Sequence, residues 1–223
     1  MIREVVGHRP FRPSGFVVRA EDLDGKTLVH NYGHGGGGIS LAWGSSALAI
    51  RELGSRAPGR VAVIGSGIMG LTSARLLQDA GWQVTIYTRD VTMQIDPGTL
   101  LRALNRDFRL AGGSFVIRNF ASADEVLALA EPVLFNCTGL GAAALFGDAE
   151  LIPAKGQLVF LPPDPAVDYM TLGGGRGQLY MFPRTDVLLL GGTFKPGDYS
   201  THPEPEETER IVGEHARLFA EFG

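Results

Sequence analysis

Residues 61–70 read VAVIGSGIMG, an apolar and mostly β-branched run followed by three glycines spaced G-x-G-x-x-G. The pattern predicts a buried strand, a tight turn and a helix. Gly65 would make the turn, Gly67 would let a phosphate approach the backbone, and Gly70 would let the helix pack closely on the strand. The pyrophosphate of a dinucleotide fits at the N-terminus of such a helix. The alternative is a purely structural turn.

The flanking residues complete a β-α-β unit. We expect a strand at Arg60–Ile64, a helix at Leu71–Ala80 and a second strand at Gln83–Tyr87. The two strands of such a unit run parallel. Ile68 and Met69 lie in the turn beside the expected pyrophosphate.

The position that usually carries an acidic residue for the ribose follows the second strand, and here it holds Arg89 and Asp90. Asp90 could bind the ribose or be a solvated loop charge. Arg89 could instead accept the 2′-phosphate of NADP. This motif alone therefore leaves the cofactor class open.

A second glycine-rich segment, residues 30–38, reads HNYGHGGGG. Backbone without Cβ atoms can lie against a flat ligand and offer it bare N–H and C=O groups. His30 and His34 would need a helix to converge on a metal ion, and the neighbouring glycines oppose a helix, so we expect no metal. The two glycine segments together predict a large dinucleotide held along its length.

The remaining pattern indicates two parts. Ser55–Gly59 is polar and rich in helix breakers, which makes it the best linker candidate. Helices and strands alternate up to about residue 135, and short strands separated by Pro and Gly then predict an antiparallel sheet. The other expected elements are strands at Gly15–Ala20, Thr27–Val29, Ser114–Arg118, Val133–Phe135, Gly156–Leu161, Gln178–Phe182 and Val187–Gly191, and helices at Ile39–Leu53, Pro97–Leu110, Ser122–Ala130 and Glu204–Phe222.

The composition is that of an ordinary globular protein, with 223 residues, 44% hydrophobic and 20% charged. A net charge of −4 gives no indication of a nucleic-acid or anionic-membrane partner. The single cysteine, Cys137, excludes an internal disulfide framework and is typical of a small buried residue. No apolar run has the ~20 residues of a membrane span and no leader precedes Arg3. The expected location is cytoplasmic, with export after removal of a leader as the alternative.

Segments typical of one family are spread over most of the chain. The most specific is HNYGHGGGG, and the others are Gly7–Pro13 (GHRPFRP), Trp43-Gly44, Asn136–Gly139 (NCTG), Lys155–Gln157 (KGQ) and Leu190–Thr193 (LGGT). With these segments the chain resembles the D-amino-acid oxidase family, whose members use FAD.

Two features depart from the family pattern. In the family the GHRP and HNYGHGGGG segments follow the LGGT strand, whereas here they come first, as in a circular permutant; joining Gly223 to Met1 restores the order. The family also has a long stretch after the β-α-β unit, which includes a loop against the flavin and part of the substrate domain. This sequence passes from Asp90 straight to Val91–Gly98, so that stretch is either deleted or outside the sequence. A deletion would weaken flavin binding and activity.

The resemblance implies an α/β fold with a Rossmann-like FAD-binding parallel sheet and a mixed or antiparallel substrate sheet. The FAD-binding domain would comprise residues 30–150 and 200–223, and the substrate-binding sheet residues 1–29 and 151–199. The implied activity is oxidative deamination of D-amino acids to 2-oxo acids, ammonia and hydrogen peroxide, with hydride transfer to FAD and reoxidation by oxygen. The oligomeric state stays open, a homodimer being one option.

The resemblance also implies roles for single residues. Arg9 would bind the substrate carboxylate through two parallel hydrogen bonds, with Tyr180 assisting and the carbonyl of Gly36 accepting from the amine. The plainer alternatives are a surface arginine and an ordinary strand tyrosine. Arg12 is expected to be structural, and Arg176 lies in a glycine-rich lid candidate at 173–177. The residues expected to hold FAD are Gly35, Gly36, Gly37, Gly38, Ile39, Ser40, Gly65, Gly67, Ile68, Met69, Gly70, Arg89, Asp90, Thr138 and Gly139.

Two rival functions stay open at this point. Arg89 favours an NADP-binding reductase, which would carry no bound chromophore. The missing stretch after Asp90 favours a non-catalytic flavin-binding remnant, which would be yellow but would not turn over.

Overall fold

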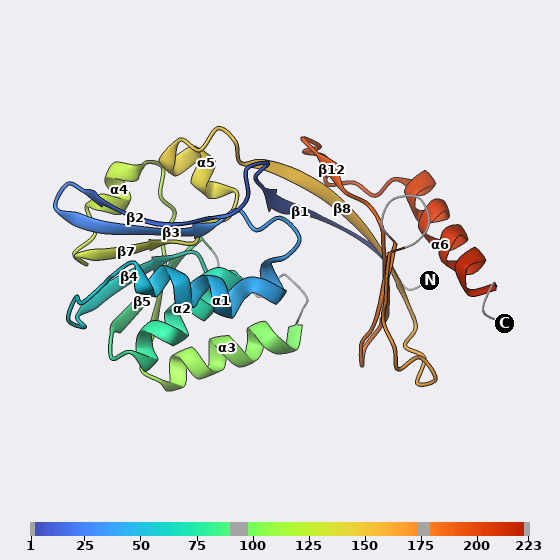
Figure 1. Ribbon diagram of the computed structural model, residues 1–223, viewed down its shortest axis with the longest axis horizontal. Coiled ribbons are helices and arrows are strands. Elements are labelled where there is room, and N and C mark those ends of the chain that lie inside the picture. The colour runs from blue at the N-terminus through green and yellow to red at the C-terminus, as the bar shows by residue number, and fades with distance from the viewer. Residues whose placement is uncertain (1–2, 90–97, 174–178, 221–223) are drawn as a thin grey trace. The chain divides into compact units, whose positions relative to one another are not determined.

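The computed structural model describes residues 3–89, 98–173 and 179–220. Its chain forms two compact units (Figure 1). Pro10–Ile152 is called the glycine-loop unit here, and Met1–Arg9 with Pro153–Gly223 is called the sheet unit. Asp90, the sequence that follows it up to residue 97, and Arg176 lie outside the described residues.

The glycine-loop unit has a six-stranded sheet with the order β2-β3-β7-β4-β5-β6. All neighbouring pairs are parallel except β2 with β3, which is antiparallel. Its strands are β2 (Val17–Leu23), β3 (Lys26–Tyr32), β4 (Arg60–Ile64), β5 (Gln83–Thr88), β6 (Ser114–Ile117) and β7 (Val133–Asn136), and its helices are α1 (Gly38–Arg51), α2 (Ile68–Asp79), α3 (Gly98–Leu110), α4 (Ala123–Leu127) and α5 (Gly141–Phe146).

The apolar runs of the central strands supply core on both faces of this sheet. Along β4, Val61 and Val63 pack with residues of α1, α2 and α3, whereas Ala62 and Ile64 pack with residues of α4 and its neighbours. The helices accordingly lie on both sides of the sheet (Figure 1). A strand covered on both faces has no polar side, which is why its sequence shows an apolar run rather than alternation.

The sheet unit has strands in the order β1-β8-β11-β10-β9, with β12 also paired to β8. The pairings of β8 with β11 and β12, and of β10 with β9 and β11, are antiparallel. The elements are β1 (Arg3–Phe11), β8 (Ile152–Leu161), β9 (Thr171–Leu172), β10 (Tyr180–Pro183), β11 (Leu188–Gly191), β12 (Lys195–Pro196) and α6 (Pro205–Ala220).

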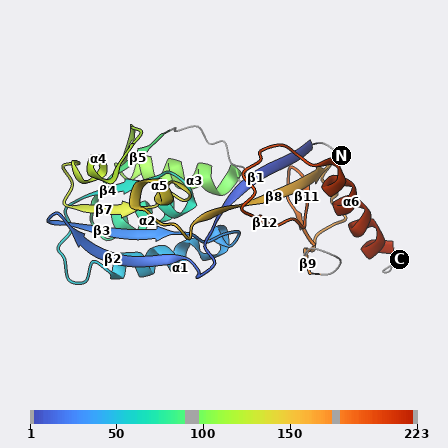
Figure 2. The same cartoon turned by 90° about the horizontal axis from the view of Figure 1, so that it is seen from above.

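Helix α6 covers one face of that sheet, where Ile211 packs against Val159, Met181 and Leu190 (Figures 1 and 2). A separate cluster forms around Phe160, and Tyr180 packs against it. Among the described helices none combines the length and the apolarity needed to cross a membrane.

The observed units differ from the expected domains at two places. Residues 10–29 belong to the glycine-loop unit because β2 pairs with β3 and β3 with β7, and residues 200–223 belong to the sheet unit because α6 packs there. Ser55–Gly59 is not a linker between units, since it connects α1 to β4 inside one of them. Strands β1, β9 and β12 and helix α5 were not expected from the sequence.

Candidate functional site

The three glycines of the turn between β4 and α2 differ in what surrounds them. Gly65 has φ +108°, and its N–H donates to the carbonyl of Tyr87 at 2.8 Å. A Cβ on Gly65 would lie under 3.0 Å from the Cys137 carbonyl, and one on Gly70 under 3.0 Å from the Gly65 carbonyl. A Cβ on Gly67 would meet no atom within 4 Å. Packing therefore requires two of the glycines, while the third leaves open space beside the backbone.

That open space lies at the N-terminus of α2. Gly67 is the N-cap residue and gives the helix no side-chain cap, and the first turn carries no acidic residue. The N–H groups of a first helical turn and the helix dipole attract an anion when no side chain satisfies them. The geometry therefore fits a phosphate group, as the glycine spacing predicts.

The second glycine segment leads into α1 close to the same point. Gly37 is the N-cap of α1 and also supplies no side chain. A Cβ on Gly38 would lie 3.5 Å from the Ile68 side chain, at ordinary contact distance, so the starts of α1 and α2 are neighbours. Two helix N-termini without side-chain caps thus lie side by side in the glycine-loop unit.

Polar residues of the HNYGHGGGG segment fasten this region together. The Asn31 amide donates to Ser46 at 3.2 Å on α1 and to Ser73 at 3.1 Å on α2. His34 hydrogen-bonds with Ser45 at 2.7 Å, and burial lowers the pKa of its imidazole to about 4. These contacts join β3 to both helices, so Asn31 and His34 hold the glycine loops in place.

His30 belongs to a second buried set. Its Nδ1 accepts from the Asn136 amide at 3.0 Å, so the proton lies on Nε2, which donates to Glu21 at 2.9 Å. The side-chain oxygen Oδ1 of Asn136 accepts from the hydroxyl of Thr138 at 2.7 Å. Burial raises the pKa of the Cys137 thiol to about 12, which argues against a nucleophilic role.

Arg12 lies in a separate ion pair of the same unit. Its guanidinium contacts Asp148 at 2.8 Å, and the Tyr32 hydroxyl donates to the same carboxylate at 2.7 Å. Burial, followed by that hydrogen bond, raises the pKa of Tyr32 to about 12. These contacts agree with a structural role for Arg12.

The sheet unit brings Arg9 and Tyr180 together. The Nη2 of Arg9 donates to the Tyr180 hydroxyl at 3.1 Å, and its Nη1 donates to the carbonyl of Thr193 at 3.0 Å. Neither partner is charged, and no ion pair of Arg9 occurs among the described residues. A guanidinium with unused N–H groups and no anionic partner can donate hydrogen bonds to a carboxylate and bind it.

Two glycines make room for this pair. A Cβ on Gly156 would lie under 3.0 Å from the Arg9 guanidinium, and one on Gly191 under 3.0 Å from the Tyr180 ring. Gly191 stands directly opposite Tyr180 in the β10–β11 register, which explains the second clash. The KGQ and LGGT segments are visible in the sequence, but their spacing assigns no role to these two glycines or to Thr193.

The remaining predicted residues lie in the glycine-loop unit. Arg89 is exposed after β5, and Gly36, Ile39 and Ser40 are exposed around the start of α1. Gly139 has φ +57° in the turn that follows β7. Their roles toward a cofactor stay predictions.

A family model described as FAD dependent oxidoreductase matches residues 91–223, which is more than half of the chain. The chain belongs to the FAD-dependent oxidoreductase family. The match confirms the resemblance seen in the sequence. It starts after Asp90 and does not include the two glycine segments, so the permuted order stays a prediction.

Similar curated proteins of this family include two named D-amino-acid oxidase. The one from Streptomyces coelicolor is 35% identical over 134 residues, which is 57% of this chain and 40% of that protein. The one from Dictyostelium discoideum is 29% identical over 136 residues, 61% of this chain and 38% of that protein. A human protein named D-aspartate oxidase is 34% identical over 80 residues, 36% of this chain and 23% of that protein. The chain thus spans less than half the length of these relatives.

Proposed function

We propose that this protein is an FAD-dependent oxidase that deaminates D-amino acids to 2-oxo acids, with release of ammonia and hydrogen peroxide. The observation that carries the proposal is the Arg9–Tyr180 pair, in which a guanidinium with no anionic partner in the described part of the chain lies 3.1 Å from a phenol hydroxyl. The names of the relatives from Streptomyces coelicolor and Dictyostelium discoideum, both D-amino-acid oxidase, support the same activity. An NADP-binding reductase is less well supported, because the family match is to FAD-dependent proteins.

The cofactor would bind to the glycine-loop unit as to a Rossmann-like sheet. Its pyrophosphate would lie at Gly67, where the backbone is open and the N-terminus of α2 has no side-chain cap. The ring and its side chain would lie along Gly35–Ser40, where the four glycines at 35–38 have no Cβ atoms and allow close approach. Thr138 and Gly139 follow β7 at the carboxyl end of the parallel strands, where α/β sheets bind ligands.

The reaction breaks the Cα–H bond of the amino acid and converts its C–N bond into C=N, and water then hydrolyses the imino acid. FAD, when bound, accepts the hydride and passes both electrons to oxygen, which leaves as hydrogen peroxide. The protein's part is to position the substrate. Arg9 and Tyr180 would hold the carboxylate, and the Gly36 carbonyl would accept a hydrogen bond from the amine.

The first test is the visible spectrum of the purified protein, before and after anaerobic addition of mixed D-amino acids. We expect flavin bands that bleach with D- but not with L-isomers. Bands that persist would contradict the oxidase and favour a flavin-binding protein without turnover. A colourless protein that does not take up added FAD would contradict the cofactor assignment as well.

The second test is the change Arg9→Ala. It should raise KM for D-amino acids strongly while the flavin spectrum is retained. An unchanged KM would show that Arg9 does not bind the carboxylate.

A further inference from the structure

The chain between β11 and β12, which runs opposite β8, contains a bulge. Strand β8 pairs with β11 as far as Leu158↔Gly191, and it pairs with β12 from Lys155↔Lys195. Between these pairs residues 192–194 lie opposite residues 156–157, so three residues face two. Bulges of this kind redirect the chain and often lie beside functional sites.

The side chain of Thr193 replaces the missing backbone pairing at the bulge. Its hydroxyl accepts a hydrogen bond from the N–H of Gln157 and donates to the carbonyl of the same residue at 3.2 Å. Both residues are buried. Without the hydroxyl, a buried backbone N–H and a buried carbonyl would lose their partner, which is costly.

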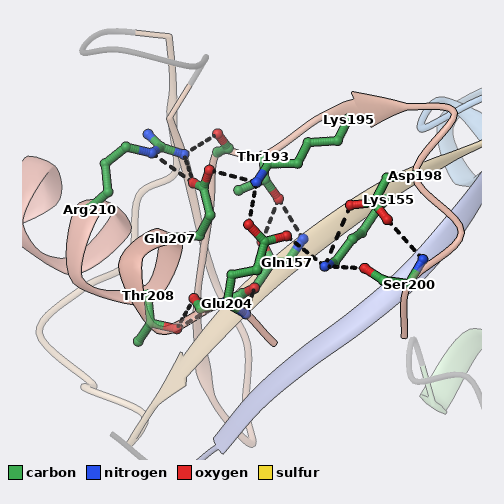
Figure 3. A network of polar contacts seen from close by, with 11 residues as sticks. Lys155, Gln157, Thr193, Lys195, Asp198, Ser200, Glu204, Glu207, Thr208 and Arg210 are labelled. Atoms are coloured by element: carbon green, nitrogen blue, oxygen red, sulfur yellow. Dashed lines mark hydrogen bonds and ion pairs between the residues drawn. The ribbon is translucent and has the colours of Figure 1, made fainter. Parts of the chain in front are cut away.

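The bulge is also held from the side of α6 (Figure 3). The Gln157 side chain donates to Thr208 at 2.6 Å and accepts from the N–H of Glu204 at 2.8 Å. The carbonyl of Gly192 accepts from Arg210 at 2.8 Å. Hydrogen bonds therefore hold the backbone on either side of the Thr193 hydroxyl, and with it the Thr193 carbonyl.

That carbonyl is the acceptor for Arg9. It takes the Nη1 hydrogen bond at 3.0 Å, while the Tyr180 hydroxyl takes the Nη2 bond at 3.1 Å. Two acceptors on two nitrogens fix the plane of the guanidinium. The Thr193 carbonyl belongs to the bulge, and the Thr193 side chain hydrogen-bonds across that bulge to Gln157 of β8.

We propose that Thr193 is a positioning residue, whose hydroxyl holds the bulge and thereby orients Arg9 for a carboxylate. The identity of the ligand rests on the proposed function, whereas the orientation of Arg9 does not. A second prediction follows at once. Serine at this position should preserve the orientation of Arg9, because it keeps the hydroxyl. Valine should not, although it matches threonine in shape.

The test compares Thr193→Val, Thr193→Ser and a matched control, Thr171→Val. Thr171 lies on β9 of the same sheet, and its buried hydroxyl has no hydrogen-bond partner among the residues that the structure describes. The control therefore removes a hydroxyl that takes no part in the bulge. Guanidinium rotation of Arg9 is measured by NMR on 15N-labelled protein, with Arg9→Lys to assign the signal. We expect restrained rotation in the wild type, Thr193→Ser and Thr171→Val, and rotation about tenfold faster in Thr193→Val, as for one lost hydrogen bond to a charged group.

Steady-state kinetics with D-amino acids provide the second readout. Thr193→Val should raise KM about tenfold or more with a smaller change in kcat, and Thr193→Ser should restore it. Unchanged Arg9 rotation in folded Thr193→Val overturns the proposal, whether or not the protein is an oxidase. Should Thr193→Val fail to fold, wild-type rotation in an Ala variant of Thr193 would overturn it equally. Faster rotation without any effect of Arg9 variants on KM would support the positioning role and refute the proposed function.

Discussion

The change Gly156→Ala should separate carboxylate binding from folding. The added methyl group would lie under 3.0 Å from both Nη atoms and the Cζ of Arg9, closer than real Cβ atoms approach other atoms. Gly156 does not have a positive φ, so alanine fits the backbone of β8 without strain. The clashing atoms are the end of a flexible side chain. Arg9 should therefore leave its position while the strand stays in place.

The expected magnitudes follow from the bonds that Arg9 makes. A hydrogen bond to a charged group is worth ~1.5–3 kcal/mol, so losing a bidentate carboxylate contact costs ~3–6 kcal/mol. At ~1.4 kcal/mol per factor of ten, KM for a D-amino acid should rise about 10²- to 10⁴-fold. By the same figure, the two hydrogen bonds of Arg9 to Thr193 and Tyr180 are worth ~3–6 kcal/mol, and the strand preference of alanine over glycine returns ~0.5–1 kcal/mol of this. The free energy of unfolding should therefore fall by ~2–5 kcal/mol.

The matched control is Gly7→Ala on β1. It makes the same substitution in the same sheet, at a position where a Cβ would meet no atom within 4 Å. Steady-state kinetics give KM, and urea unfolding gives the free energy of unfolding. Wild-type KM in Gly156→Ala would refute the steric reasoning. An equal loss of binding in Gly7→Ala would show that any added methyl group in this sheet is harmful, which refutes it too.

The remaining predictions concern the glycine-loop unit and α6. Gly67→Ala should change the free energy of unfolding by no more than about 1 kcal/mol but weaken FAD binding about tenfold or more in a fluorescence titration. Gly70→Ala should lower the free energy of unfolding of the apoprotein by more than ~2 kcal/mol, because its methyl group meets backbone atoms. Equal effects of the two changes would contradict this. Burial lowers the pKa of His34 from 6.5 to about 4, so between these pH values the folded protein binds fewer protons than the unfolded chain. The free energy of unfolding should therefore fall as the pH drops from 6.5 to 4, and this group contributes at most about 1.4 kcal/mol per pH unit. Urea unfolding at pH 7 and 5 checks it, and the same slope in His34→Gln would assign the effect to another group, such as His30, whose pKa burial also lowers. Gly213→Ala, inside α6 with open space around its Cβ position, should raise the free energy of unfolding by about 1 kcal/mol.

Local signals predicted the glycine-loop unit well. Strands β4 and β5 appear within one residue of the expected bounds, because a buried parallel strand needs an apolar run and the turn needs its glycines. Helix α2 starts earlier than expected, at Ile68, because Gly67 already serves as its N-cap. These features depend on residues close together in the chain.

The missed elements lack such local signals. Strand β1 contains Gly7, Arg9 and Pro10, and only weak alternation. It stands at the end of its sheet in the strand order, where glycine and proline are tolerated. Helix α5 has six residues, too few for a helical period to be seen. Periodicity cannot reveal elements whose stability comes from their neighbours.

The candidate carboxylate site could be predicted only in part for the same reason. Arg9 and Tyr180 were named from resemblance, but their hydrogen bond joins residues 171 positions apart, and Arg9 reaches Thr193 across 184 positions. The role of Gly191 follows from strand register, because it stands opposite Tyr180, and that of Gly156 follows from the position of the Arg9 guanidinium against β8. Register is a property of the assembled sheet and cannot be read from a short sequence motif such as KGQ.

Glycines accordingly have two roles in this protein, and only one of them can be recognised from the spacing of glycines in the sequence. At Gly65 and Gly70 the obstructing atoms are backbone carbonyls, so the glycines are conditions of the fold. At Gly156 and Gly191 the obstructing atoms belong to the side chains of Arg9 and Tyr180. These glycines are therefore needed for the proposed carboxylate site and not for the formation of the sheet. A methyl group at the first kind of position has to move main chain, whereas at the second it has only to move a side chain. Substitutions at the second kind should therefore change substrate binding in a protein that still folds. Within the KGQ and LGGT segments this applies to Gly156 and Gly191 and not to the buried, hydrogen-bonded Gln157 and Thr193.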